Sequence, residues 1–163
     1  MAKRQHAVKT VDRHGSRSPA GDAFSALVIQ VLRLSGLLTA AGDALAKPSG
    51  QTSARWQVLA AAENAPATVA QIARMLGLTR QSVQRVADLL ERDGLAVFDE
   101  NPQDLRAELL RLTPRGRSAL ATIQAAQCTW ADELGAKIGE AHLRRAREVL
   151  ERVSAAVLRA TTS

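Results

Sequence analysis

The sequence predicts a mainly α-helical protein with one short β-hairpin. The 163-residue chain is 46% apolar but only 2% aromatic, so Ala and Leu, which favour helices, supply most of its core. Apolar residues recur at helical spacing over most of the chain, whereas only two short runs have the character of strands. A chain of this length suits one domain, with or without extended arms, and can bury a core without disulfides.

The charge of the chain favours a polyanionic partner, but only weakly. The formal net charge is +6, and residues 1–20 alone hold five basic residues against one acid, which leaves the rest of the chain at +2. Residues 1–20 are polar and end in a Gly, Ser and Pro-rich stretch, so we expect a disordered basic arm. No apolar stretch follows the first charges, which argues against a secretory signal peptide.

The first helix is expected over residues 22–46, where apolar residues recur at helical spacing and cover more than one stripe. Arg33 lies near the middle of this segment, and an Arg at a membrane midpoint costs about 2.5–3.5 kcal/mol. The segment is therefore interpreted as a buried helix rather than a membrane span. A loop over residues 47–53 and a second helix over 53–62 follow, with Trp56 and Leu59 directed inward.

The next two helices form a helix-turn-helix candidate. Thr68 and Gln71 form a capping box for a helix over residues 69–76, which Gly77 ends. Thr79 is the expected N-cap of a helix over residues 80–92, which Asp93-Gly94 ends. Their packing is assigned to six residues: Ala73 at the crossing, Val83 and Val86 on the second helix, and Ile72, Leu76 and Leu78.

The exposed face of the second helix carries side chains suited to DNA. Arg suits guanine, Gln suits adenine, and short hydroxyls suit either, while a helix N-terminus attracts phosphate. An ordinary helical hairpin with a solvated face is the alternative. Acids at Asp88, Glu91 and Asp93 confine the suitable surface to the front of the helix. The candidate DNA-binding residues on this helix are Thr79, Arg80, Gln81, Ser82, Gln84 and Arg85.

Two short strands, residues 95–98 and 108–113, surround a turn-rich stretch and predict a two-stranded wing. Its Arg106 is a candidate for the minor groove, and Asp104 is expected to hold Arg106 by a charge-assisted bond. The alternative is an ordinary surface ion pair.

Two long helices complete the chain. Thr113-Pro114 marks the start of a helix that runs to about residue 137, and a last helix runs to the C-terminus. The last helix carries apolar residues in a heptad pattern, which is typical of a helix–helix seam. The heptad positions are Leu143, Ala146, Leu150, Val153 and Val157.

The runs "TVAQIARMLGLTRQSVQRVADLLERDGLAV" and "NPQDLRAELLRLTPRG" resemble the MarR family of bacterial transcription regulators. The shared features are the winged helix-turn-helix, the Asp-x-Arg wing at Asp104–Arg106, and a Leu-Thr-x-x-Gly step ending at Gly116. The resemblance implies a MarR-like domain over residues 21–163, with a DNA-binding lobe at 53–116 and dimerisation helices at 21–46 and 117–163. It also implies a homodimer, held by the terminal helices, that represses transcription at a pseudo-palindrome of double-stranded DNA. Packing of these helices within one chain only is the alternative. A small aromatic or lipophilic effector is a further implication.

Other candidate sites give weaker signals. Cys128, the single cysteine, is interpreted as a packed residue rather than a redox sensor, and it fits a reducing cytoplasm. Trp56 is assigned to the core, with lining of an effector cleft as the alternative. The three histidines show no metal spacing, and no catalytic or phosphate-binding motif is present. We therefore expect no enzymatic activity, cofactor, metal or membrane association. A winged-helix module that binds only proteins is the main alternative function.

Overall fold

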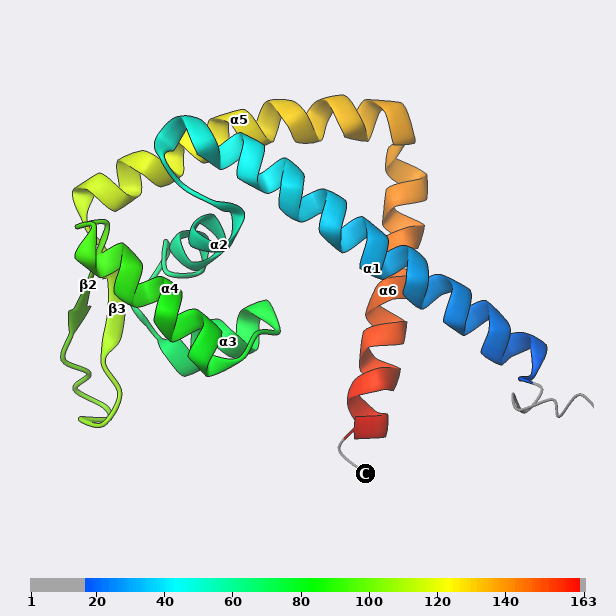
Figure 1. Cartoon of the computed structure of the whole chain (residues 1–163), viewed down its shortest axis with the longest axis horizontal. Coiled ribbons are helices and arrows are strands. Elements are labelled where there is room, and N and C mark those ends of the chain that lie inside the picture. Colours follow the sequence, from blue (N-terminus) through cyan, green and yellow to red (C-terminus); the bar gives the residue numbers. More distant parts are fainter. Residues whose placement is uncertain (1–16, 162–163) are drawn as a thin grey trace, which may run out of the picture. The chain divides into compact units, whose positions relative to one another are not determined.

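The computed structural model of the chain describes residues 17–161. The chain divides into two compact units, residues 1–38 and 39–163, and each is described by itself. Helix α1 (Pro19–Ala46) begins in the first unit and continues into the second (Figure 1). Ser18 Oγ accepts a hydrogen bond from the backbone N–H of Gly21 at 3.1 Å, and Pro19 suits the first helical position. The helix therefore begins three residues before the expected start.

This early start corrects one boundary of the predicted arm. Pro19 and Ala20 belong to α1 rather than to a disordered segment. The Ser-Pro pair was assigned to the disordered arm, whereas it caps and starts the helix. Residues 1–16 of the predicted arm lie outside the described residues.

The part of α1 in the first unit is apolar and exposed. The side chains of Ile29, Leu32 and Leu37 are 64%, 68% and 60% exposed, and the only buried residues of α1 are Gly42 and Ala46. Within the single chain this part of α1 is therefore exposed rather than buried, and its expected role as a dimerisation helix stays a prediction. Among the described residues, α1 with the turn after it is also the one helix long and apolar enough to cross a membrane. A helix that packs against another protein surface meets the same criterion. Composition alone therefore does not distinguish a membrane span from a helix at a protein interface.

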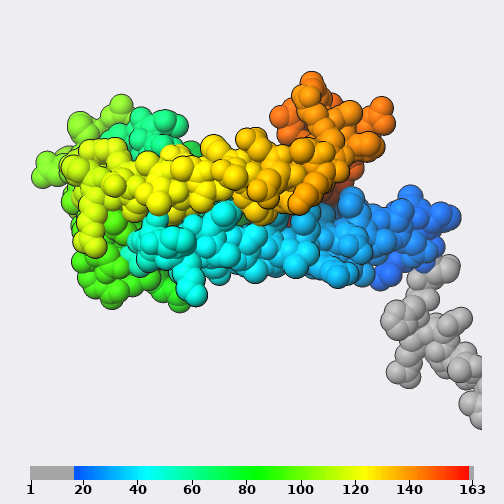
Figure 2. Space-filling model, turned by 90° about the horizontal axis from the view of Figure 1, so that it is seen from above, coloured from blue at the N-terminus to red at the C-terminus, as the bar shows by residue number. Residues whose placement is uncertain are grey.

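The second unit contains a small winged lobe followed by two long helices (Figure 1). In Figure 2, α5 (yellow) extends from this lobe (green) to the start of α6 (orange). The elements after α1 are η1 (Lys47–Ser49), α2 (Ser53–Ala61), β1 (Ala67–Thr68), α3 (Val69–Leu76), α4 (Arg80–Arg92), β2 (Ala96–Asp99), β3 (Leu109–Leu112), α5 (Pro114–Ile138) and α6 (Glu140–Thr161).

Local capping signals set the helix boundaries of the lobe. Thr68 and Gln71 form both bonds of the predicted capping box. Gly77 ends α3 in the left-handed conformation, with φ of 66°, which glycine adopts without strain. The Thr79 hydroxyl accepts from the Ser82 N–H at 3.2 Å, and Thr113 accepts from Gly116 at 3.0 Å. The predicted caps of α3, α4 and α5 are confirmed.

The sheet contains one strand that the sequence did not predict. The strand order is β1-β3-β2, and both pairings are antiparallel. β2 and β3 form the predicted two-stranded wing, while β1 pairs Ala67 with Leu110 and Thr68 with Leu109. A two-residue strand has no alternation to detect, and its partner lies far along the chain.

The core of the lobe brings α2, α3, α4, β2, β3 and the start of α5 together. Trp56 is half-buried and packs against this core. Leu78 is 46% exposed, so its predicted burial is wrong. Its backbone N–H donates to the Ala73 carbonyl at 2.9 Å, and this bond, rather than side-chain burial, fixes its position in the turn. The buried core residues are Val58, Leu59, Ala62, Ile72, Ala73, Val83, Ala87, Leu90, Leu95, Ala96, Leu110, Leu112 and Leu120.

Helix α6 buries none of its residues within the chain. Leu143, Leu150 and Val157 of the predicted heptad are 40%, 37% and 45% exposed. Arg144 and Glu140, which lie one turn apart on this helix, form an ion pair. The apolar seam of α6 is therefore accessible to a second surface.

Candidate nucleic-acid interface

Helix α4 separates a buried face from a polar face, as its periodicity predicts. Val83, Ala87 and Leu90 are fully buried, and Val86 is half-buried against the core. All six candidate residues of the opposite face are exposed. These are Thr79, Arg80, Gln81, Ser82, Gln84 and Arg85.

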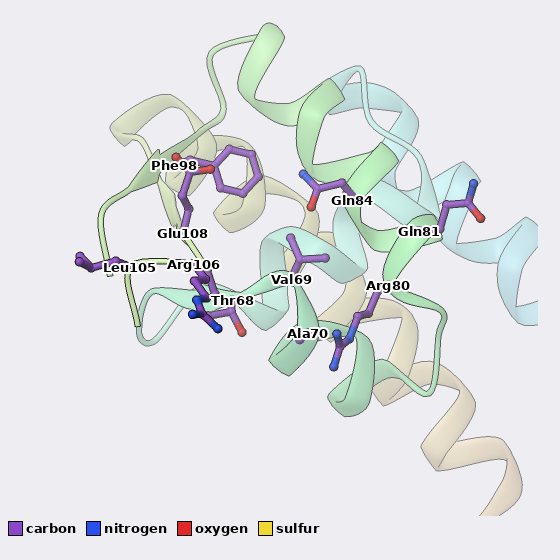
Figure 3. Close-up of a pocket in the computed structure, with 11 residues that line it drawn as sticks. Thr68, Val69, Ala70, Arg80, Gln81, Gln84, Phe98, Leu105, Arg106 and Glu108 are labelled. Atoms are coloured by element: carbon purple, nitrogen blue, oxygen red, sulfur yellow. The ribbon is translucent and has the colours of Figure 1, made fainter. Parts of the chain in front are cut away.

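A groove of about 650 Å³ lies between α4, the start of α3 and the wing (Figure 3). It brings together Arg80, Gln81 and Gln84 of α4 with Arg106 of the wing. In Figure 3, Gln84 extends from α4 toward the wing, and Leu105 points outward from the wing. Four other candidate residues do not line this groove, namely Thr79, Ser82, Arg85 and Asp104. The remaining lining residues are Thr68, Val69, Ala70, Phe98, Leu105, Ala107 and Glu108.

The C-terminal end of α4 is held by cationic side chains that sequence reasoning missed. Arg55 of α2 donates to the Asp93 carboxylate at 2.5 Å and to the Leu89 carbonyl at 3.3 Å. Arg115 of α5 donates to the Asp93 carbonyl at 3.1 Å. Cations at this end complement the helix dipole and bind carbonyl groups near its last turn. The contacts fix the direction of α4 relative to α2 and α5.

The same cluster perturbs the carboxyl group of Asp93. The hydrogen bond from Arg55 holds the pKa of Asp93 below its ordinary value, with the charge of Arg55 and contacts of Arg92 acting in the same direction. Desolvation opposes this shift but is outweighed. Asp93 therefore stays ionised to lower pH than an isolated aspartate.

The junction between the wing and α5 requires a glycine. A Cβ at Gly116 would lie 1.9 Å from the carbonyl oxygen of Leu95, far inside contact distance. Leu95 accepts the backbone N–H of Thr113 at 3.1 Å, and the Thr113 hydroxyl donates to the Gly94 carbonyl at 2.8 Å. The Leu-Thr-x-x-Gly step therefore joins the first turn of α5 to the end of α4.

An ion pair joins the two strands of the wing near its loop. Arg111 binds both oxygens of Asp99, at 2.5 and 3.2 Å. The hydrogen bond and charge of Arg111 lower the pKa of Asp99, and Asp99 in turn raises the pKa of Arg111. This two-point contact links the two strands of the hairpin.

The predicted bond between Asp104 and the Arg106 side chain is wrong. Asp104 Oδ1 instead accepts a hydrogen bond from the backbone N–H of Arg106 at 3.0 Å. Among the described residues, no ion pair forms between the Asp104 and Arg106 side chains. A short carboxylate reaches the backbone two residues on, as in an Asx turn. Asp104 therefore shapes the turn, while the exposed guanidinium of Arg106 is not held by it.

Two hydrogen bonds on the front of α4 arrange its polar side chains. The Thr79 and Ser82 hydroxyls lie 2.8 Å apart. Gln84 Nε2 donates to Asp88 Oδ1 at 2.7 Å. The second contact joins residues one helical turn apart, so the i,i+4 spacing would have revealed it.

Cys128 lies exposed on α5, so its predicted packing is wrong for the single chain. The helix continues past its last buried residue, Ile123, and Cys128 lies beyond the core. Within residues 17–161, no cluster of three His, Cys, Asp or Glu side chains could hold a metal ion.

A MarR family model matches residues 49–107, which include α2, α3, α4, β2 and most of the wing loop. A protein of Mycobacterium tuberculosis is 39% identical over 136 residues, which cover 83% of this chain and 95% of that protein. The chain belongs to the MarR family. This is a family of transcription regulators.

Solved structures agree with this membership. The M. tuberculosis regulator MosR, crystallised in complex with DNA, superposes with a TM-score of 0.68 at 26% identity, over 80% of this chain and 96% of that chain. A MarR/EmrR family regulator from Acinetobacter gives a TM-score of 0.75 over 83% and 96% of the two chains. Its identity of 18% makes it evidence for the fold alone. The predicted winged helix-turn-helix fold is confirmed.

Proposed function

We propose that this MarR-family regulator binds double-stranded DNA in a sequence-specific manner. The observation that carries the proposal is the groove in which Arg80, Gln81 and Gln84 of α4 meet Arg106 of the wing. The similarity to MosR, which was crystallised with DNA, supports the same use of this lobe. A helix and a hairpin that present cations along one groove suit the major groove and the adjacent backbone.

The candidate residues divide into three roles. Gln81, Gln84 and Arg85 contact base edges in the major groove, because they point away from the buried face of α4. Arg80, with the hydroxyls of Thr79 and Ser82 at the start of α4, binds a phosphate. At the wing, Arg106 enters the minor groove or binds its phosphates, and Asp104 maintains the turn that presents it.

The regulator acts as a cytoplasmic homodimer that represses transcription. Support comes from two apolar surfaces that are exposed in the single chain, one on the first unit's part of α1 and one on α6. A twofold dimer places two copies of α4 in major grooves about 34 Å apart, which matches a pseudo-palindromic operator.

We further propose that a small aromatic or lipophilic effector controls binding. Two structural neighbours support this proposal: CouR from Rhodococcus jostii, solved with p-coumaroyl-CoA, and a Staphylococcus aureus MarR, solved with salicylate and kanamycin. Trp56, which is half-buried, is the candidate lining residue.

The test uses fluorescence anisotropy with duplexes from the region upstream of the chain's own gene and with scrambled duplexes of equal composition. Both are measured at one fixed salt concentration, because phosphate contacts make affinity strongly salt-dependent. Preference for one upstream duplex by about tenfold or more would support the proposal. Equal affinity for all duplexes would contradict sequence-specific binding. Absence of binding at low salt would favour the winged-helix module that binds only proteins.

A further inference from the structure

The contact between Gln84 and Asp88 bears on which base α4 selects, if the proposed DNA-binding function holds. Both side chains are exposed on α4, and Gln84 Nε2 donates to Asp88 Oδ1 at 2.7 Å. The two residues are one turn apart, so the contact depends only on the helix itself. Gln84 also lines the groove and extends toward the wing (Figure 3).

A carboxylate determines which way a glutamine amide faces. A glutamine side chain presents a carbonyl oxygen on one side and an NH₂ group on the other, and rotation about its last bond exchanges them. A carboxylate accepts hydrogen bonds but donates none, so it binds the NH₂ group and repels the carbonyl oxygen. Asp88 thus selects one of the two orientations of Gln84. The Oε1 atom and the second N–H of Gln84 then remain for another partner.

The remaining pair of groups matches one base best. Adenine presents one donor and one acceptor at its major-groove edge, which an amide oxygen and N–H can bind together. Guanine presents two acceptors, so Oε1 would meet an acceptor there. The negative charge of Asp88 adds to the repulsion of an edge with two acceptors.

We propose that Asp88 is a positioning residue that fixes the Gln84 amide and so gives α4 its preference for adenine at one operator position. Asp88 does not itself contact the base. Its carboxylate reduces overall attraction to phosphates, while it increases discrimination among bases. Affinity and specificity should therefore respond to Asp88 in different directions.

Four variants and the wild-type chain separate these effects. Selection from randomised duplexes first defines the preferred site, and Gln84→Ala identifies the base pair whose preference depends on Gln84. Asp88→Asn keeps the size of the side chain but can accept or donate, so it permits both amide orientations. Asp88→Glu keeps a carboxylate that accepts only. Glu91→Gln is the matched control, because it removes a carboxylate from the same helix and leaves the Gln84–Asp88 pair intact.

The wild-type chain should prefer adenine at this position by about fivefold or more, the low end of what a bidentate contact contributes. Asp88→Asn should reduce the preference to about twofold or less while affinity for scrambled duplexes stays equal or rises. Asp88→Glu and Glu91→Gln should keep the preference. In the DNA-free protein, the NMR signals of the Gln84 side-chain amide should shift in Asp88→Asn and not in Glu91→Gln.

Two results would overturn the proposal. If wild-type protein selects a site but Asp88→Asn retains the wild-type preference, the positioning role is wrong and sequence-specific binding stands. If the wild-type chain selects no sequence, the proposed function fails, and the role of Asp88 fails with it.

Discussion

The winged lobe (residues 53–116) differs from the terminal helices α1 and α6 in how far its apolar side chains are buried. Both regions are built from similar apolar residues. In the lobe, Leu59, Ile72 and Leu90 are 0% exposed. In the first unit, Leu32 of α1 is 68% exposed, and α6 buries none of its residues. The lobe therefore completes its own core within one chain, whereas the terminal helices retain apolar surface that water would penalise.

The largest expected effect concerns the exposed seam of α6. Replacing Leu150 and Val153 together with Glu should abolish the dimer at micromolar concentration, because each buried carboxylate would lose solvation worth several kcal/mol. Arg152→Glu, on the same helix but outside the heptad seam, is the control and should stay dimeric. Sedimentation velocity measures both variants. A well-folded wild-type monomer at these concentrations would contradict the assignment of the seam to a partner.

The second prediction compares two glycines of α5. A Cβ at Gly116 would clash with the Leu95 carbonyl, whereas nothing lies within 4 Å of a Cβ at Gly135. Gly116→Ala should therefore destabilise the chain by about 1–3 kcal/mol. Gly135→Ala should stabilise it by up to about 1 kcal/mol through helix propensity. Urea unfolding at one protein concentration gives both values, and equal effects would show that close packing does not distinguish the lobe from the distal helix.

The smallest effect is the pH dependence of the ion pair at the end of α4. The folded-state pKa of Asp93 lies below the ordinary value of 3.8, so the ionised form stabilises the folded chain. This stabilisation is fully present above pH 3.8 and is lost as the pH falls through the depressed pKa. The difference in free energy of unfolding between wild type and Asp93→Asn should therefore become smaller as the pH falls below 3.8. A difference that stays constant down to pH 2 would indicate a cause other than ionisation.

The sequence predicted the elements of the lobe well because their signals are local. The capping box at Thr68, the turn at Gly77 and the Thr113-Pro114 start each depend on a few adjacent residues, and all are present. The strand β1 and the Arg55–Asp93 contact were missed because each joins segments far apart in the chain. The periodicity of one segment does not indicate which distant segment it will contact.

The candidate interface was predicted in its residue types but not in its contacts. The exposed face of α4 follows from the 3.6-residue period, so its six residues could be named in advance. The expected partner of Asp104 was wrong, because the choice between a backbone N–H and a guanidinium depends on the turn conformation. The predicted packing of Cys128 was wrong for the single chain, whereas the interface role of the exposed part of α1 stays a prediction. Apolar composition predicts that a surface will be covered, but not which chain covers it.

We propose that α4 selects bases while the wing contributes affinity, and one measurement tests this division most directly. Arg85→Ala and Arg106→Ala are compared with wild type on the preferred duplex and on a scrambled duplex at one salt concentration. Arg85→Ala should remove about 1–3 kcal/mol of discrimination, and so weaken binding to the preferred duplex far more than to the scrambled one. Arg106→Ala should weaken both more evenly, with any sequence effect confined to A·T-rich flanks. If Arg85→Ala lowers both affinities equally, α4 only binds phosphates and the account of base selection is wrong.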